Sequence, residues 1–384
     1  MNFILILGVI LVFSALSCKT TNRFGLPVLV GFILIGLLIR NWYKFDDLNT
    51  VRNICDFALL LIIFTGGFQT DFTDAKPVLA VSTVLSAAGT ILTALFSGFF
   101  AFYFMRLEFY QAMLLGAVIS STDVASVFSV LRSKQMDLKN HLNSVLEVES
   151  GSNDPFAHIM TVVLITLAMG GSHQNIISLL IRQIVLGVLS GFIFAKLGQQ
   201  FINRINLDID GIYGAILCGV AFIIYGAADQ LGGNGFLAVY IGGIMLGNGK
   251  LVYKRFLSRL SSAISMLMQI MLFIVLGMLC VPESITAIIG NSLLFALFLF
   301  FIARPIITFT LMKPFRRPLN EIALVSWAGF RGASSIVFAT YVLTSGLPYA
   351  EHVFSIVFFV CMLSVIIQGT FIGPIAKKLD LLDD

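Results

Sequence analysis

Apolar stretches of about 20 residues recur along the whole chain, and this pattern limits the possible folds more than any other feature. Of the 384 residues, 58% are hydrophobic and 11% are charged, against roughly a quarter charged in soluble domains. Lipid offers backbone groups no water to bond with, and these stretches are far longer than the strands of a barrel. The composition therefore predicts an all-α polytopic membrane protein and excludes a soluble enzyme or a nucleic-acid-binding protein.

Breaks rich in charged residues, Gly, Pro or Asn divide the chain into thirteen predicted transmembrane helices. They lie near residues 3–18, 24–40, 53–69, 77–104, 109–131, 142–170, 175–199, 211–228, 234–249, 257–280, 285–311, 320–345 and 350–376. Of the 24 Lys and Arg residues, only four lie in the even-numbered connections and three lie within spans. The rest lie in the odd-numbered connections and the C-terminal tail, so we expect the N-terminus outside and the C-terminus inside.

Polar residues are costly at membrane depth and need a partner or a function, and three of these spans contain clusters of them. The 109–131 span contains Ser120, Ser121, Thr122 and Asp123. The 142–170 span contains Glu147, Glu149, Asn153 and Asp154, and the 320–345 span contains Gly329, Arg331, Gly332, Ala333, Ser334 and Ser335. The other two arginines within spans, Arg182 and Arg304, are interpreted as snorkelling or capping carbonyls. Asp56 and Asp229, near span ends, are interpreted as interfacial.

The 109–131 and 320–345 spans are seven helices apart, and small polar residues break each near its middle. Broken helices at matching positions of two halves are typical of a transporter ion site, and an interval of seven makes the two repeats inverted. Where broken helices cross, half-helix ends carry partial charges. We therefore expect Asp123 and Arg331 to offset such charges.

The 142–170 span separates into faces at 100° per residue. One polar stripe contains Glu147, Gly151, Asp154 and His158. Glu149 lies on another face, and we expect it to pair with Arg331 because each charge is costly alone at this depth. His158 is interpreted as a packed, hydrogen-bonded residue, and Glu147 as structural.

Asp154 is the predicted centre of an ion site. Ser150, Thr122, Asp123 and the Gly151 carbonyl, left free by the missing N–H of Pro155, would add oxygen ligands. Such ligands suit a monovalent cation, and Na⁺ and K⁺ remain open. A carboxylate also binds protons, so we expect cation and proton to compete for Asp154. Dispersed cysteines and histidines indicate no cofactor, disulfide framework or metal cluster.

Three motifs, TDVASVF at 122–128, ESGSNDPFA at 149–157 and GFRGASS at 329–335, resemble those of the CPA1 monovalent cation/proton antiporters. The resemblance is to the NhaP type, and within it to the potassium/proton antiporters called cell volume regulation protein A. It covers essentially the whole chain. Members often continue into cytoplasmic regulatory domains, which we expect to be absent here.

This resemblance implies a homodimer in the cell (inner) membrane, with crossed broken helices, an elevator-like core near 77–170 and 285–378, and scaffold helices near 1–70 and 205–280. Asp154 would be the shared cation/proton carboxylate, with Thr122, Asp123, Ser150 and Glu149 at ion-site positions. Asn153 would replace a second aspartate, which implies electroneutral exchange. Arg331 would match a structural arginine opposite Glu149, while His158 departs from the apolar residue expected there.

Other functions remain as alternatives to antiport. A cation channel is disfavoured because the chain lacks a carbonyl-filter sequence such as TVGYG. A sodium-coupled symporter of an organic anion would need further cationic ligands. An intramembrane hydrolase is disfavoured because no HExxH or GxSxG motif occurs. The sequence therefore predicts a secondary transporter and not an enzyme.

Overall fold

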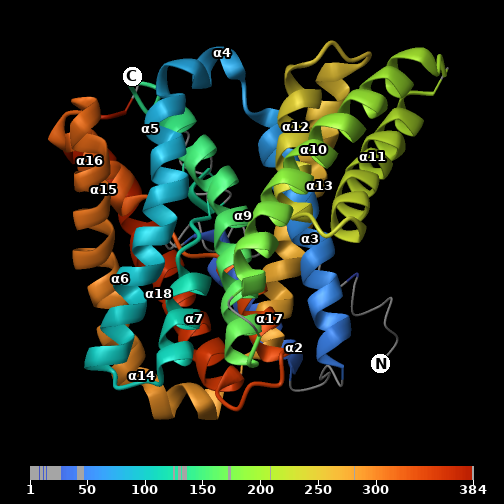
Figure 1. Ribbon diagram of the computed structural model, residues 1–384. Coiled ribbons are helices and arrows are strands. Elements are labelled where there is room, and N and C mark those ends of the chain that lie inside the picture. The colour runs from blue at the N-terminus through green and yellow to red at the C-terminus, as the bar shows by residue number, and fades with distance from the viewer. Residues whose placement is uncertain are drawn as a thin grey trace.

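The computed structural model describes residues 8, 12, 14, 27–40, 47–123, 126–128, 131, 136–171, 174–207, 209–280 and 282–382. Within these ranges the secondary structure is helical, apart from one isolated bridge between Leu138 and Leu382. The long helices run roughly along one common direction, between the two ends of the molecule (Figure 1). This arrangement confirms the all-helical prediction.

The α-helices are α2 (Val28–Arg40), α3 (Leu48–Gln69), α4 (Phe72–Ala75), α5 (Leu79–Val84), α6 (Thr90–Phe104), α7 (Phe109–Ile119), α9 (Leu142–Ala168), α10 (Gln174–Arg204), α11 (Asp210–Gln230), α12 (Gly235–Asn248), α13 (Lys254–Leu279), α14 (Pro282–Phe298), α15 (Arg304–Met312), α16 (Leu319–Trp327), α17 (Ala333–Leu343) and α18 (Ala350–Lys378). Two 3₁₀ turns, η1 (Lys76–Val78) and η4 (Lys313–Phe315), and two π turns, η2 (Leu85–Gly89) and η3 (Leu299–Ala303), complete them.

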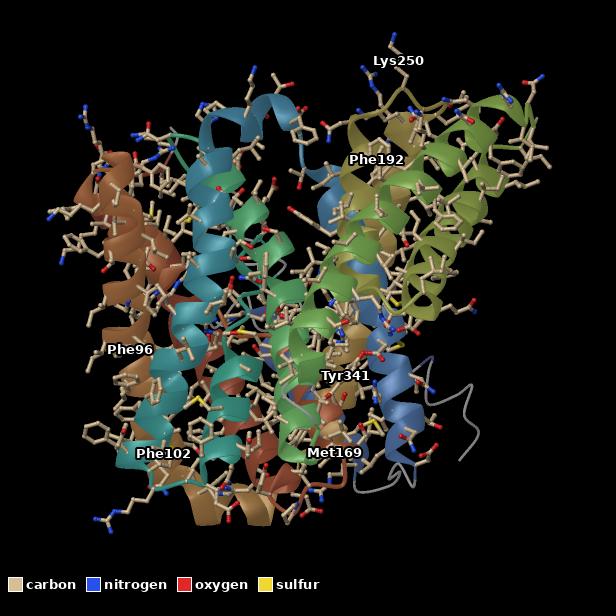
Figure 2. All side chains as sticks on the ribbon, in the orientation of Figure 1. Phe96, Phe102, Met169, Phe192, Lys250 and Tyr341 are labelled. Carbon is tan, nitrogen blue, oxygen red and sulfur yellow. The ribbon has the colours of Figure 1, made fainter. Side chains whose placement is uncertain are left out.

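Seven of the described helical stretches are long and apolar enough to cross a membrane, and α2, α7, α12 and α17 are shorter apolar helices. The described helix ends lie within about five residues of the predicted ones. Residues 3–18 lie almost entirely outside the described part, so the count of thirteen stays a prediction. Lys250 and the C-terminus lie at one end of the molecule, and Phe102 and Met169 at the other (Figures 1 and 2).

Side chains cap the N-terminal ends of two helices, α3 and α12. The Asp47 carboxylate accepts hydrogen bonds from the backbone N–H groups of Asn49 (2.9 Å) and Thr50 (3.2 Å), so Asp47 caps α3. The Asn234 side chain accepts from the Leu237 N–H (2.8 Å) and caps α12 in the same way. These caps satisfy donors that the first helical turn leaves without an intrahelical partner.

Two predicted spans are interrupted as expected. Helix α7 ends at Ile119, residues 121–123 are not helical, and helix returns at 126–128. In the second span, α16 ends at Trp327 and α17 begins at Ala333. Ser, Thr and Asp side chains compete for backbone hydrogen bonds, and Gly adds backbone freedom, so both sequences favour a break.

The helices pack in two groups. In one, α3 packs against α12 and α13, α2 against α13, and α10 against α11 and α12. In the other, α6 packs against α7, α15 against α16, and both α14 and α17 against α18. Figure 1 shows the groups on opposite sides of the molecule, and α9 contacts α7 of one group and α12 of the other. Helix α9 therefore lies where the groups meet.

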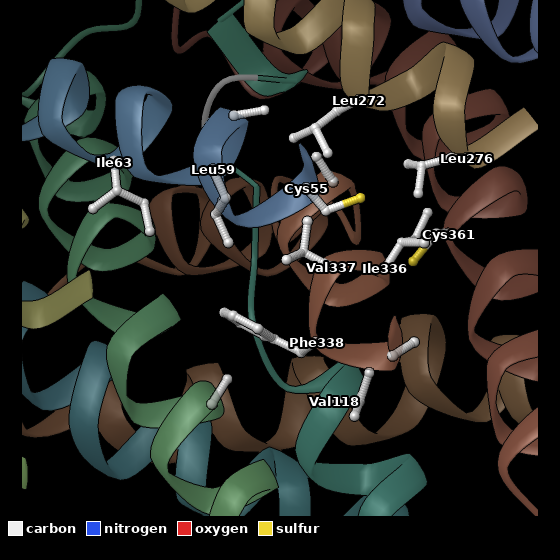
Figure 3. Close-up of a cluster of buried hydrophobic side chains, with 14 of the residues drawn as sticks. Cys55, Leu59, Ile63, Val118, Leu272, Leu276, Ile336, Val337, Phe338 and Cys361 are labelled. Atoms are coloured by element: carbon white, nitrogen blue, oxygen red, sulfur yellow. The ribbon is translucent and has the colours of Figure 1, made fainter. Parts of the chain in front are cut away.

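An apolar cluster joins the two groups. Figure 3 shows Cys55 and Leu59 of α3 and Leu272 of α13 beside Val118 of α7 and Phe338 of α17, all buried. The described cysteines Cys55, Cys218, Cys280 and Cys361 are free, and all but Cys218 are buried.

Each of the two π turns interrupts a long helical stretch, one in the first half of the chain and one in the second. Turn η2 lies between α5 and α6, and turn η3 lies between α14 and α15. Turn η2 packs against α15, whereas η3 packs against α6. Nearby, the rings of Phe100 and Phe298 stack with centroids 3.8 Å apart. The packing of these two interrupted helices is therefore reciprocal.

Candidate functional site

The two helix breaks contact each other directly. The Asp123 N–H donates to the Phe330 carbonyl (2.8 Å), and the Ala333 N–H donates to Asp123 Oδ2 (3.0 Å). Asp123 Oδ1 also accepts from the Ser126 N–H (3.2 Å). The Asp123 carboxylate therefore lies at the N-terminal ends of α17 and of the helix that resumes after the first break, where partial positive charge concentrates.

Arg331 has the opposite role. Its Nη1 donates to the carbonyls of Ser120 (2.7 Å) and Ser121 (2.8 Å), at the C-terminal end of α7. The side chain is completely buried. The prediction that Asp123 and Arg331 offset the partial charges of the half-helices is therefore confirmed.

Asp154 of α9 lies beside this crossing. It is 7% exposed, and Ser121 Oγ donates to its Oδ1. Ser121 Oγ is also 2.7 Å from Ser334 Oγ of α17. The carboxylate therefore accepts from a hydroxyl of the first break, and that hydroxyl is itself hydrogen-bonded to one at the start of α17. Among the described residues no Lys, Arg or His forms an ion pair with Asp154.

A cavity of about 30 Å³, here called the Asp154 cavity, adjoins this carboxylate. Its polar wall consists of Thr122, Asp123, Ser150, Asp154, Gln269 and Ser334, with Gly151 beside them. The rest of the wall is apolar and comes from α3 and from Ala333 of α17. The volume suits about one water-sized particle, so the cavity has room for one ion that has lost its water.

The predicted site residues mostly meet here. Asp154, Asp123, Thr122, Ser150 and Gly151 all line the Asp154 cavity. Thr122 Oγ1 is 2.8 Å from Ser150 Oγ.

Two supporting residues lie beside the wall. The buried Asn153 donates to Thr122 Oγ1 (2.5 Å). Glu147 is half-buried on α9 but is not among the described residues that line the cavity.

The predicted pair between Glu149 and Arg331 is wrong. Arg304 Nη2 lies 2.5 Å from Glu149 Oε1, and the two side chains are 3% and 1% exposed. Arg331 is instead held at the helix crossing by the carbonyls described above. Arg304 begins α15 directly after the π turn η3. Because it is buried and ion-paired with Glu149, it does not snorkel, in contrast to its sequence interpretation.

Three residues near Asp154 were absent from the predicted site. Ser121 and Ser334 belong to the polar breaks in the sequence, which was the available signal. Gln269 is a single amide in an apolar span, 8% exposed, and its Nε2 donates to Ser265 Oγ (3.4 Å). Among the described residues, its Oε1 has no hydrogen-bond partner. An isolated polar residue in a long apolar span was the only sequence signal for it.

His158 is packed, as predicted. Asn234 Nδ2 lies 3.0 Å from His158 Nδ1, and the imidazole contacts the rings of Phe236, Phe338 and Tyr341. Asp56, interpreted as interfacial, is partly buried and accepts from the Tyr341 hydroxyl (2.9 Å).

An all-helical membrane chain with two broken helices crossing beside a buried carboxylate has the fold of a sodium/proton antiporter. The solved structure of the sodium proton antiporter MjNhaP1 from Methanocaldococcus jannaschii matches this chain with a TM-score of 0.83 at 22% identity, over 99% of both chains. The family model "Sodium/hydrogen exchanger, transmembrane" matches residues 9–378, and the chain belongs to this family. The family resemblance of the three motifs is thus confirmed.

Two relatives have similar sequences along nearly the whole chain. The K(+)/H(+) antiporter NhaP of Alkalimonas amylolytica is 30% identical over 98% of this chain. The K(+)/H(+) antiporter NhaP2 of Shewanella oneidensis is 32% identical, also over 98%. In each case the chain spans 67% of the relative's length. Family membership and the apolar helices place this chain in the cell membrane as a multi-pass protein.

Proposed function

We propose that this chain exchanges a monovalent cation, K⁺ or Na⁺, for a proton at Asp154. One observation carries the proposal: a buried carboxylate without an ion pair, among the described residues, adjoins a cavity sized for one particle at a helix crossing. The printed functions of the two relatives, K⁺/H⁺ antiport, and of the solved neighbour, sodium/proton antiport, support it. The chain is a secondary transporter and not an enzyme.

The wall of the Asp154 cavity supplies the chemistry. The Asp154 carboxylate, the hydroxyls of Ser150, Thr122 and Ser334, and the free Oε1 of Gln269 are hard oxygen ligands, which suit alkali cations. A proton on Asp154 removes the charge that holds the cation, so the two ions compete for one group. Asn153 is neutral, and the charge of Asp123, the other carboxylate in the wall, is offset by the half-helix ends that it caps. Asp154 is then the one uncompensated charge in the wall, so exchange is electroneutral.

Alternating access requires one group of helices to move against the other. We assign the moving core to residues near 77–170 and 285–378, and the scaffold and dimer contact to residues near 1–70 and 205–280. Helix α10 packs on α11 and α12 and belongs with the scaffold. The reciprocal packing of η2 and η3 supports two inverted repeats. Positive residues at the C-terminal end support an N-out, C-in orientation.

Proteoliposomes with an internal pH dye and an imposed KCl or NaCl gradient test this proposal. Cation-driven proton flux that persists with the membrane potential clamped, and that falls to the protein-free level in Asp154→Asn, supports electroneutral exchange at Asp154. The control is Asp210→Asn, which neutralises an exposed carboxylate at the start of α11 and leaves flux unchanged. Full flux in Asp154→Asn contradicts the site, and cation current without proton movement indicates a channel.

A further inference from the structure

A second, larger cavity lies one helical turn from the Asp154 cavity along α9. It has a volume of about 600 Å³ and is here called the Asp229 cavity. Its polar wall includes Arg52 and Asp56 of α3, His158 of α9, Gln183 of α10, Asp229 of α11 and Tyr341 of α17. Tyr341 lies in the half of the molecule that contains Met169, away from Lys250 (Figure 2).

The charges on this wall leave an excess of negative charge. Arg52 Nε lies 3.8 Å from Asp56 Oδ2, and the Arg52 guanidinium lies 3.7 Å from the centre of the Tyr341 ring. Asp229 is exposed and forms no ion pair with any described residue. Arg182 is not part of the wall and donates to the Gly232 carbonyl (3.3 Å). Two carboxylates therefore face one guanidinium, which favours a monovalent cation in the cavity.

A buried oxygen on the same wall points independently to a ligand. Gln183 is 8% exposed, and its Oε1 has no hydrogen-bond partner among the described residues. A buried amide oxygen without a partner is unfavourable, and amide oxygens coordinate hard cations. An alkali cation held by Asp229 and Asp56 would satisfy it.

A layer of rings separates the two cavities. The His158 ring lies 4.9 Å from that of Tyr341, 5.1 Å from that of Phe236 and 5.6 Å from that of Phe338, centre to centre. His158 follows Asp154 by one turn on α9, and Phe338 follows Ser334 by one turn on α17. A cation in the Asp229 cavity is therefore close to Asp154 but does not contact it.

We infer that the Asp229 cavity is a second monovalent-cation site, in which Asp229, Asp56 and Gln183 Oε1 hold the ion that passes to or from Asp154. The passage rests on the proposed exchange, whereas binding in the cavity does not. The occupant is K⁺ or Na⁺, the same ion as at Asp154. The site therefore raises the local cation concentration at one entrance of the exchanger.

Binding is tested by thermal unfolding of purified Asp154→Asn protein in KCl or NaCl, against choline chloride at equal ionic strength. We expect the alkali cation to raise Tm by about 2 °C at ten times Kd. Adding Asp229→Asn and Gln183→Leu should remove this rise, whereas adding Asp210→Asn should keep it. The inference is overturned if Asp154→Asn protein shows no cation-dependent rise, or if the rise survives Asp229→Asn with Gln183→Leu.

Transport gives a second readout, in vesicles of defined orientation. Asp229→Asn should raise the half-saturating cation concentration about fivefold when the cation enters from the Met169 end, with the maximal rate kept within twofold. The value from the Lys250 end should not change. An equal change from both ends, or no change, contradicts the second site. Failure of the proposed exchange can be distinguished from failure of the second site, because the wild-type protein would then show no cation-driven proton flux.

Discussion

At the scale of single residues, Asp154 and Glu149 lie five positions apart on α9 and are both buried, yet their surroundings differ. Glu149 is paired with the Arg304 guanidinium at 2.5 Å, so its charge is compensated. Asp154 accepts a hydrogen bond from a hydroxyl and adjoins a cavity. Two carboxyl groups on one helix thus differ in their surroundings: Glu149 is ion-paired, whereas Asp154 has no ion pair among the described residues and lies beside a cavity.

Gln269→Leu should weaken cation binding without removing exchange. It deletes one neutral oxygen from the Asp154 cavity, which corresponds to about 1–1.5 kcal/mol, or roughly a tenfold rise in the half-saturating cation concentration. Initial rates of proton flux over a range of KCl and NaCl measure it. Gln69→Leu is the control, since Gln69 bonds Ser262 outside this cavity. An unchanged value for both cations would exclude Gln269 as a ligand.

The Glu149 and Arg304 pair should be strongly coupled. Glu149→Leu or Arg304→Met alone leaves a buried charge uncompensated, at a cost of about 3–5 kcal/mol, whereas the double variant removes both charges. A double-mutant cycle on thermal unfolding measures the coupling. The same cycle with Arg331→Met in place of Arg304→Met should give a smaller coupling. If the coupling of Glu149 with Arg331 were larger than that with Arg304, the result would favour the Glu149 and Arg331 pair expected from the sequence.

Periodicity predicts which face of α9 a residue occupies, but it does not predict which distant partner reaches that face. Both Arg304 and Arg331 lie mid-span, so the sequence leaves the partner of Glu149 ambiguous. The break at 328–332 places Arg331 against α7 carbonyls, and Arg304 follows a π turn, a feature that apolar patterns do not reveal. Gln183 and Gln269 were missed because an isolated amide carries no motif.

At the scale of helices, the crossing depends on backbone atoms that approach closely. A Cβ on Gly332 would lie 2.0 Å from Asp123 Oδ2, so this position excludes any side chain while Asp123 caps α17. The breaks themselves were predictable because Ser, Thr, Asp and Gly clusters are conspicuous in apolar spans. That the two breaks contact each other could be inferred only from their matching positions in the two halves of the chain, because the contact itself depends on tertiary packing.

Gly332→Ala should therefore abolish exchange and lower the thermal stability of the protein. The new methyl group displaces the Asp123 carboxylate, and both half-helix ends lose their compensation. Gly226→Ala in α11 is the matched control, because a Cβ there meets nothing within 4 Å and Ala favours helix. Proton flux and thermal unfolding measure both variants. Normal flux in Gly332→Ala would show that the cap at Ala333 is dispensable.

At the scale of the whole molecule, the two groups of helices should move relative to each other. His158→Cys with Asn234→Cys places thiols where α9 meets the start of α12, at a contact of 3.0 Å between the native side chains. In a background without the five native cysteines, a short thiol cross-linker should arrest exchange, and reduction should restore it. Proton flux before and after reduction measures this.

The control for that experiment is a cross-link within one group. Gln69→Cys with Ser262→Cys joins α3 and α13, whose native side chains are 2.5 Å apart. Because both helices belong to the proposed scaffold, flux should continue after cross-linking. Continued flux with the α9 to α12 cross-link in place would argue against relative movement of the two groups.

The ring layer between the two cavities has an electrical consequence. From Asp154 to His158 is four residues, or about 6 Å of helix. Only a small part of the membrane potential falls across a large polar cavity that water can enter. The electrical potential difference between the Asp229 cavity and Asp154 therefore falls mainly across this thin layer of rings. Each elementary charge that crosses 100 mV changes energy by about 2.3 kcal/mol. When one cation and one proton cross the layer in opposite directions, these two contributions cancel, and the exchanger becomes insensitive to membrane voltage.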